Sequence, residues 1–227
     1  MALKELRARN KDITDQALAQ LVACVGPHSR QLISEIEKLS LYVGDRSEIG
    51  PKDVDAIVTR TKQARAFALG DALGDRNLPK LLKALDEELW EMQFDKQKSE
   101  IGILYGLISK VRTMLLIQEM LKAGWIKPES DYTRFKTQLE RVPVEELPKD
   151  KRFNPLAINP YVLFKAVAQS RNYTSEELVQ AMDLLLRCNR KLVMSGLEGS
   201  LVLQQTLAQI VTRPATKPAT PILAGRR

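Results

Sequence analysis

The sequence predicts an all-α protein, on three observations. Leucine dominates the apolar residues, while runs of β-branched residues are scarce, and this bias favours helices over strands. Apolar residues recur every three or four positions, which is the period of an amphipathic helix. Glycine and proline fall between these periodic stretches, where they end one helix and begin the next. We therefore expect a small three-helix bundle at residues 12–62, a larger helical domain at residues 63–211 and a tail at residues 212–227.

The first unit contains three short amphipathic helices. Gly26 and Pro27 separate the first helix from the second, because a glycine commonly ends a helix and a proline suits a first turn. Gly44 is expected to end the second helix, and Pro51 to lie in the first turn of the third. The apolar stripes of the first two helices are Leu18, Leu21, Val22 and Val25, then Leu32, Ile36, Leu39 and Val43.

The second unit opens with a helix that breaks at "GDRNLP", where Asn77 can cap the helix that follows. That following helix carries one apolar side, made of Leu78, Leu81, Leu82, Leu85 and Leu89. The longest helical segment covers residues 96–122, and at about 1.5 Å per residue it would span about 40 Å. Its centre is apolar on most sides, so other helices must surround it.

Prolines interrupt the pattern between residues 128 and 160, where we expect a loosely organised connection that contains one helix. Helices return at Asn159 and Pro160, and Thr174 with Glu177 has the spacing of a capping box. A last helix covers "SLVLQQTLAQIV". The tail is rich in proline and has no means of burying a core, so we expect it to be disordered.

The residue types exclude most classes of enzyme. The chain has one histidine, His28, with no motif around it that would pair a base with a nucleophile. Cys24 and Cys188 lie within helical apolar patterns and are interpreted as small buried side chains. There is no HExxH, CxxC or aspartate cluster, and the glycines of "GDALGDRN" lack the lysine and the preceding strand of a phosphate-binding loop. We expect no catalysis, no metal and no cofactor.

The formal net charge is +7, but much of it lies in the tail. The basic residues of the tail are Arg213, Lys217, Arg226 and Arg227. The remainder is mildly basic, which is compatible with contacts to nucleic acid phosphates without establishing them. No apolar stretch is long enough to cross a membrane and the N-terminus lacks a secretion signal, so we expect a cytoplasmic protein with no membrane contact.

Tyr161 and Lys165 lie four residues apart on one helical face. One interpretation is a packed tyrosine beside a lysine whose stem lies along it. The other is a nucleotide base stacked on the ring with a phosphate on the ammonium group. The spacing favours the first interpretation and leaves the second open.

Three blocks resemble the delta subunit of bacterial DNA polymerase III, a component of the clamp loader. The first includes "LISEIEKLSLYVG", which is similar to that family's hhxEhxKLxLYxG helix, where h is apolar. The second is an aromatic-containing helix with "DAL", followed by a short loop and a leucine-rich helix. The third follows the pattern PYxxxKxxxxxRxxxxxEL from Pro160 to Leu178. Together the blocks cover most of residues 12–211.

The resemblance implies a three-helix lid domain and a helical collar through which loader subunits form a pentamer. It implies that the family's N-terminal domain, which has a nucleotide-binding-type fold and contacts the sliding clamp, is missing. Residues 1–11 would then be the end of that domain or the start of an expressed fragment. The implied partners are the tau or gamma ATPases and delta prime, with primer–template DNA near the collar, at the nucleoid-associated replisome. The candidate nucleic-acid contacts are Tyr161, Lys165, Arg171, Arg187, Arg190 and Lys191.

The same resemblance suggests a role for the helix break at "GDRNLP". The break would be the joint between the lid and the collar, and Gly74, Asn77 and Pro79 would set the angle between these two domains. An alternative function remains open, that of a free-standing basic helical protein that binds nucleic acid through the tail and residues 149–171.

Overall fold

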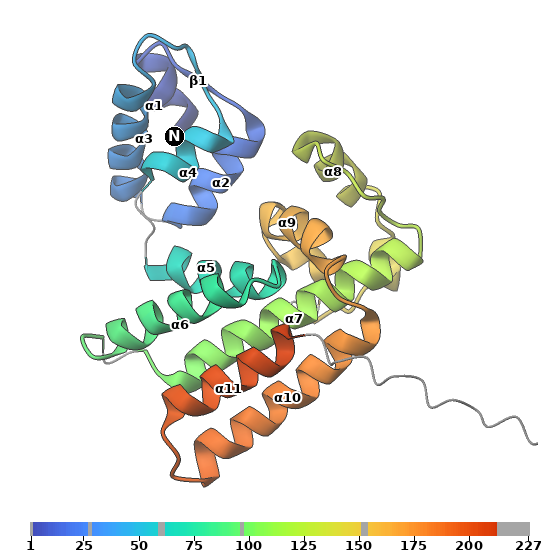
Figure 1. Cartoon of the computed structure of the whole chain (residues 1–227). Helices are drawn as coiled ribbons and strands as arrows, with labels where there is room; N and C mark the ends of the chain where they lie inside the picture. Colours follow the sequence, from blue (N-terminus) through green and yellow to red (C-terminus); the bar gives the residue numbers. More distant parts are fainter. Residues whose placement is uncertain (1, 27–28, 59–61, 96–97, 151–153, 213–227) are drawn as a thin grey trace, which may run out of the picture.

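The computed structural model describes residues 2–26, 29–58, 62–95, 98–150 and 154–212 of the chain. In these residues it is an all-α protein whose only β-structure is one pair of two-residue strands, which confirms the predicted fold class. Figure 1 shows an N-terminal group of short helices beside a larger group of longer ones. We call the first group the N-terminal body and the second the helical body.

The N-terminal body surrounds a core of its own. Its elements are α1 (Ala2–Ala8), β1 (Asp12–Ile13), α2 (Asp15–Val25), α3 (Ser29–Val43), β2 (Glu48–Ile49) and α4 (Pro51–Ile57). The buried core residues include Leu21, Ile36, Leu39 and Val54. As predicted, α2 ends before Gly26, α3 ends before Gly44, and Pro51 opens α4. Pro27 and His28 lie outside the described residues.

Two features of this body were not anticipated. Helix α1 inserts Leu6, which is 1% exposed, into the core of the N-terminal body, so residues 2–11 belong to this body. Strands β1 and β2 pair in parallel, with Asp12 opposite Glu48 and Ile13 opposite Ile49. Lys11 donates to the backbone oxygens of Gly44 and Arg46, at 2.5 and 2.7 Å, and so fixes the start of β1 against the end of α3.

The helical body is built on the long central helix α7 (Glu100–Lys122). The other helices are α5 (Lys62–Gly74), α6 (Leu78–Met92), α8 (Tyr132–Leu139), α9 (Pro160–Ser170), α10 (Ser175–Met194) and α11 (Gly199–Val211). The first half of α7 packs in a core with α5, α6, α10 and α11, to which it contributes Leu107 and Met114. Its second half packs in a further core with α8 and α9, through Ile117 and Met120. The predicted central position of this helix is therefore confirmed.

The caps predicted from sequence are present. The Asn77 side chain accepts from the Lys80 amide at 3.0 Å. Thr174 and Glu177 form the capping box of α10, with bonds of 2.9 and 3.1 Å. The connection from α7 to α9 contains α8 and two short 3-10 turns, Val144–Glu146 and Pro155–Ala157. Residues 213–227, where a disordered tail is expected, lie outside the described residues.

Candidate functional site: a polar cluster and cavity between the two bodies

A cluster of charged side chains lies where α5, α7 and α9 meet. The Asp71 carboxylate accepts from Lys165 Nζ at 2.6 Å and from Lys110 Nζ at 3.1 Å. Lys110 also donates to Gln169 Oε1, and Gln169 Nε2 donates to Asp75 at 2.8 Å. Side chains from three helices thus form one network around Asp71. The network can form in this way because residue 74 is a glycine. An added Cβ there would lie 2.8 Å from Gln169 Cδ and 2.9 Å from Lys110 Cε.

The electrostatics of this network are set by burial and by the paired charges. Burial alone would raise the pKa of Asp71, but the charges and hydrogen bonds of Lys110 and Lys165 outweigh it and hold the pKa of Asp71 below its usual value. Burial lowers the pKa of Lys110, with Asp71 opposing the shift. Lys110 is 8% exposed and Lys165 39% exposed at the side chain. Asp71 is therefore paired with one buried cation, Lys110, and with one half-exposed cation, Lys165.

A cavity of about 350 Å³ lies beside the cluster, between the two bodies. The N-terminal body contributes Gln20, Cys24 and Asp55 to its wall, and the helical body contributes Asp71 and Tyr161. Its volume falls within the range of small-ligand pockets, and domain interfaces are a common place for them. The polar groups of the helical body are largely engaged with one another, as the bonds around Asp71 show.

The arrangement offers charged and polar groups that could bind a ligand. Both oxygens of Asp71 accept from lysines, so this carboxylate is already engaged. Within the described ranges, no three His, Cys, Asp or Glu side chains gather as a metal site would require. None of the described helices is long and apolar enough to span a membrane.

Two of the predicted nucleic-acid contacts are engaged in contacts within the protein. Tyr161 is buried, its pKa is raised by burial, and its ring packs edge-on against Tyr132 with centroids 6.1 Å apart. Lys165 is bound to Asp71 and its side chain remains 39% exposed. Both side chains line the cavity between the two bodies, and these contacts fit the interpretation of a packed tyrosine beside an engaged lysine.

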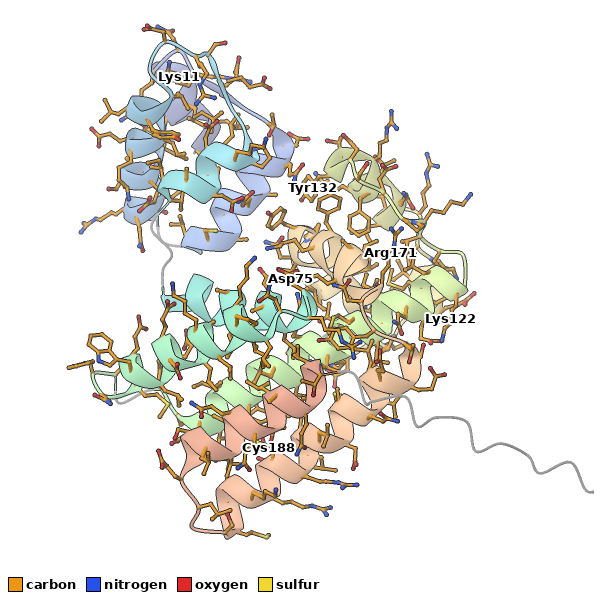
Figure 2. The ribbon with its side chains drawn as sticks, viewed as in Figure 1. Lys11, Asp75, Lys122, Tyr132, Arg171 and Cys188 are labelled. Atoms are coloured by element: carbon orange, nitrogen blue, oxygen red, sulfur yellow. The ribbon has the colours of Figure 1, made fainter. Side chains whose placement is uncertain are left out.

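The other four predicted contacts are exposed: Arg171 lines a surface pocket together with Lys165, and the other three are on α10. Arg171 is the residue that directly follows the end of α9 (Figure 2). Arg187, Arg190 and Lys191 lie on the outer surface of α10, where Arg187 pairs with Asp183 at 2.7 Å. Cys188, on the opposite face of the same turns, is buried as predicted, whereas Cys24 is only half-buried.

The residues predicted to form a joint between the two bodies have a different place. Gly74, Asn77 and Pro79 lie at the turn from α5 to α6, and both of these helices contribute to the same core, through Leu73 and Leu81. The break therefore closes a helical hairpin within the helical body. The physical reason is that the leucine faces of α5 and α6 pack on each other and not on separate bodies.

Sequence reasoning missed the Asp71 network. The sequence did carry a signal for this network, because Asp71 stands among the apolar residues Leu69, Ala72 and Leu73, and Lys110 lies in the apolar centre of the longest described helix. A single charge on an otherwise apolar helical face indicates a buried partner of opposite charge. The sequence could not say which residues those partners were.

The fold is that of a clamp loader delta protein. A solved structure, the Bacillus subtilis DNA clamp loader delta protein (YqeN), matches with a TM-score of 0.56 and 21% sequence identity, covering 93% of this chain and 55% of that one. A curated relative, DNA polymerase III subunit delta of Bacillus subtilis (strain 168), is 22% identical over 207 residues, which is 91% of this chain and 52% of the relative. No family model matches the chain. The chain is thus a homologue of that delta subunit, as its sequence indicated, and it spans about half the length of the proteins it matches.

Proposed function

We propose that the chain is the lid and collar part of a clamp loader delta subunit, a non-catalytic subunit of the DNA polymerase III holoenzyme. In this role it holds neighbouring loader subunits so that the sliding clamp is opened and placed on primed DNA. The observation that carries the proposal is the agreement of fold and sequence with one relative along more than nine-tenths of this chain. Contact with the clamp itself would belong to a part of the subunit outside this chain.

The outer surface of α10 supports a role in assembly. Its inner face buries Leu178 and Leu185 in the core, while Val179, Leu186 and Val193 are exposed at intervals of seven residues. Apolar residues at this interval form a seam along which another helix can pack. A neighbouring loader subunit, a tau or gamma ATPase or delta prime, would supply that helix.

A DNA contact near the collar would use the exposed cations Arg171, Arg190 and Lys191, because Tyr161 and Lys165 are engaged within the protein. Phosphate contacts of this kind weaken steeply with salt. The free-standing nucleic-acid-binding alternative receives less support, since within its proposed surface at residues 149–171 Tyr161 is buried and Lys165 is bound to Asp71.

The test is reconstitution with purified loader ATPases and delta prime, followed by light scattering. We expect the chain to enter a stoichiometric complex, and the variant Val179→Asp with Leu186→Asp to be excluded from it. Gln180→Asp is the matched control, because it adds a charge to an exposed polar position on the same helix. If the unmodified chain joins no complex with any of these proteins, the proposal is wrong. If the aspartate variant joins as well as the control, the α10 seam is not the contact.

A further inference from the structure

The cavity between the two bodies is lined by several small residues. They include Ala23 of α2, Ala68 and Gly70 of α5 and Gly106 of α7. An added Cβ at Gly106 would meet nothing within 4 Å, so the space beside α7 is open. Helix α2 packs against α5 and α9, which brings the walls from the two bodies together (Figure 1). Protein interiors are packed as densely as organic crystals, whereas the space here, about 350 Å³, is enough for a small ligand.

The polar groups on the helical side of the cavity are mostly bonded within the protein. Beyond the Asp71 network, the Thr113 hydroxyl donates to the Ser109 backbone oxygen at 2.8 Å. The Asn159 side-chain oxygen accepts from the Tyr161 amide at 2.9 Å. These bonds fix this wall and occupy much of its hydrogen-bonding capacity.

Gln20 and Asp55, on the wall of the N-terminal body, have capacity left. Gln20 Nε2 donates to Asp55 Oδ1 at 2.6 Å. An ionised carboxylate can only accept, so this bond fixes the orientation of the amide and leaves Oε1 as its acceptor. Gln20 is 4% exposed, and its Oε1 accepts no hydrogen bond from any described residue. A buried acceptor without a donor is rare in proteins, and it makes this wall suited to a ligand that donates a hydrogen bond.

The charged side chains that line the cavity balance one another. They are two carboxylates and two lysines, namely Asp55, Asp71, Lys110 and Lys165. An ion that entered the cavity would lose hydration without meeting an excess of opposite charge. The lining therefore favours an uncharged ligand.

The rest of the wall favours a ring. It is formed by apolar side chains and one aromatic ring, those of Ala23, Ala68, Ile158, Val162 and Tyr161. Burial against these residues removes apolar surface of the ligand from water, and an aromatic ligand gains further from an edge-to-face or offset contact with a tyrosine. An apolar wall with a few polar groups that orient the ligand is typical of small-molecule sites.

We propose that this cavity binds an uncharged aromatic molecule that carries an N–H group, such as a nitrogen heterocycle. The ring packs between α2 and α9, against Tyr161. The N–H group donates to the second carboxylate oxygen of Asp55, beside the Gln20 amide. Because both bodies line the cavity, the bound molecule stabilises their arrangement. This inference goes beyond the proposed loader role and does not depend on it.

Titration of the purified chain with indole, followed by ligand-observed NMR, tests the site. Indole is uncharged and has one N–H group, while benzofuran has nearly the same shape and no N–H group. We expect a dissociation constant for indole below about 1 mM, which is typical of a ligand of this size. Benzofuran should bind about tenfold more weakly, because it cannot donate to Asp55. Equal binding of the two molecules, or no binding of indole, would overturn the proposal.

Two substitutions test the proposed contacts. Ala23→Leu should weaken indole binding about tenfold or more by filling the cavity. Its matched control is Ala19→Leu, the same change on α2 at a residue that does not line the cavity. Asp55→Ala should weaken indole about tenfold and leave benzofuran binding unchanged, while Glu37→Ala, which removes an exposed carboxylate from α3, should change neither.

Both exposed positions, 37 and 55, can be changed without disturbing a core, which circular dichroism checks. If Asp55→Ala binds indole as tightly as Glu37→Ala does, Asp55 is not the acceptor and the proposal is wrong.

Cys24 reports whether indole binds in this cavity. It lines the cavity and is half-buried, whereas Cys188 is 1% exposed in the core of the helical body. Bound indole should slow the alkylation of Cys24 by iodoacetamide, measured by mass spectrometry, and leave that of Cys188 unchanged. If a saturating concentration of indole does not slow the reaction of Cys24, indole binds elsewhere and the proposal fails, whatever the outcome of loader reconstitution.

Discussion

Arg76 and Glu177 form a two-bonded ion pair across 101 positions of sequence, with Nη2 to Oε1 at 2.7 Å and Nη1 to Oε2 at 2.8 Å. The same guanidinium donates to the backbone oxygens of Val211 and Asn172 and lies 4.5 Å from the centroid of the Tyr173 ring. Arg76 stands in the α5–α6 turn with a φ of 54°. One side chain therefore joins this turn to the start of α10 and the end of α11.

Replacing Arg76 should destabilise the helical body. Arg76→Ala removes four hydrogen bonds and leaves a half-buried Glu177 without this cation, so we expect a loss of about 2–3 kcal/mol in the free energy of unfolding. Urea denaturation followed by circular dichroism measures it. The control is Arg187→Ala, which removes an exposed ion pair with Asp183 and should cost less than about 0.5 kcal/mol. Equal losses of stability in the two variants would mean that the hydrogen bonds of Arg76 contribute little to the stability of the helical body.

Removing the charges of both Asp71 and Lys110 should destabilise the protein less than removing the charge of Asp71 alone. Asp71→Asn leaves Lys110 buried beside a neutral group, and we expect a loss of about 3 kcal/mol. Adding Lys110→Met should recover most of that loss, because no uncompensated buried charge then remains. Lys165→Met should cost about 1 kcal/mol or less, since the lysine is 39% exposed. If the double variant is no more stable than Asp71→Asn, the charge of Lys110 is not the cause.

Two helical glycines should respond in opposite ways to alanine. An added Cβ at Gly106 meets nothing within 4 Å, so Gly106→Ala should stabilise the protein by about 1 kcal/mol through helix propensity. At Gly74 the new Cβ would lie 2.8 Å from Gln169, and displacing the bonded Gln169 and Lys110 should cost about 1–2 kcal/mol. Thermal unfolding of the two variants measures the contrast. Stabilisation by both substitutions would contradict the close packing around Gly74.

Tyr173 should make stability fall at alkaline pH. Burial raises the pKa of Tyr173 to about 12, and its hydroxyl donates to the Leu73 backbone oxygen at 2.6 Å. A tyrosine ionises near pH 10 in the unfolded chain, so its contribution is fully present below pH 10 and is lost as the pH rises towards 12.

The comparison with Tyr173→Phe isolates this effect from other titrating groups. At pH 8 the variant should be less stable by about 1 kcal/mol, since the Leu73 carbonyl loses the buried hydroxyl and keeps only the Arg76 amide as a donor. The stability difference should shrink between about pH 10 and pH 12, as measured by urea midpoints at each pH. A difference that stays constant over this range would mean that Tyr173 ionises equally in both states.

The elements of the fold were largely predictable, because helix boundaries depend on local chemistry. Asn77 and the Thr174–Glu177 box act through hydrogen bonds to residues within a few positions, while Gly26, Gly44 and Pro51 act through the backbone conformations that they allow. The parallel strands β1 and β2 were missed, since two-residue strands carry no periodic signal. Helix α1 was missed as part of the first core because its seven residues present a single buried leucine.

The sequence by itself determined that this chain is helical, where most helices begin and end, and which family it resembles, because these depend on local spacing and residue type. Only the tertiary structure decided that the α5–α6 break is a hairpin within one body, that Tyr161 is buried, and that Asp71 pairs with Lys110 and Lys165. Those partners lie 39 and 94 positions from Asp71. Packing of several helices brings them together, and no periodicity in a single helix encodes which helices will meet.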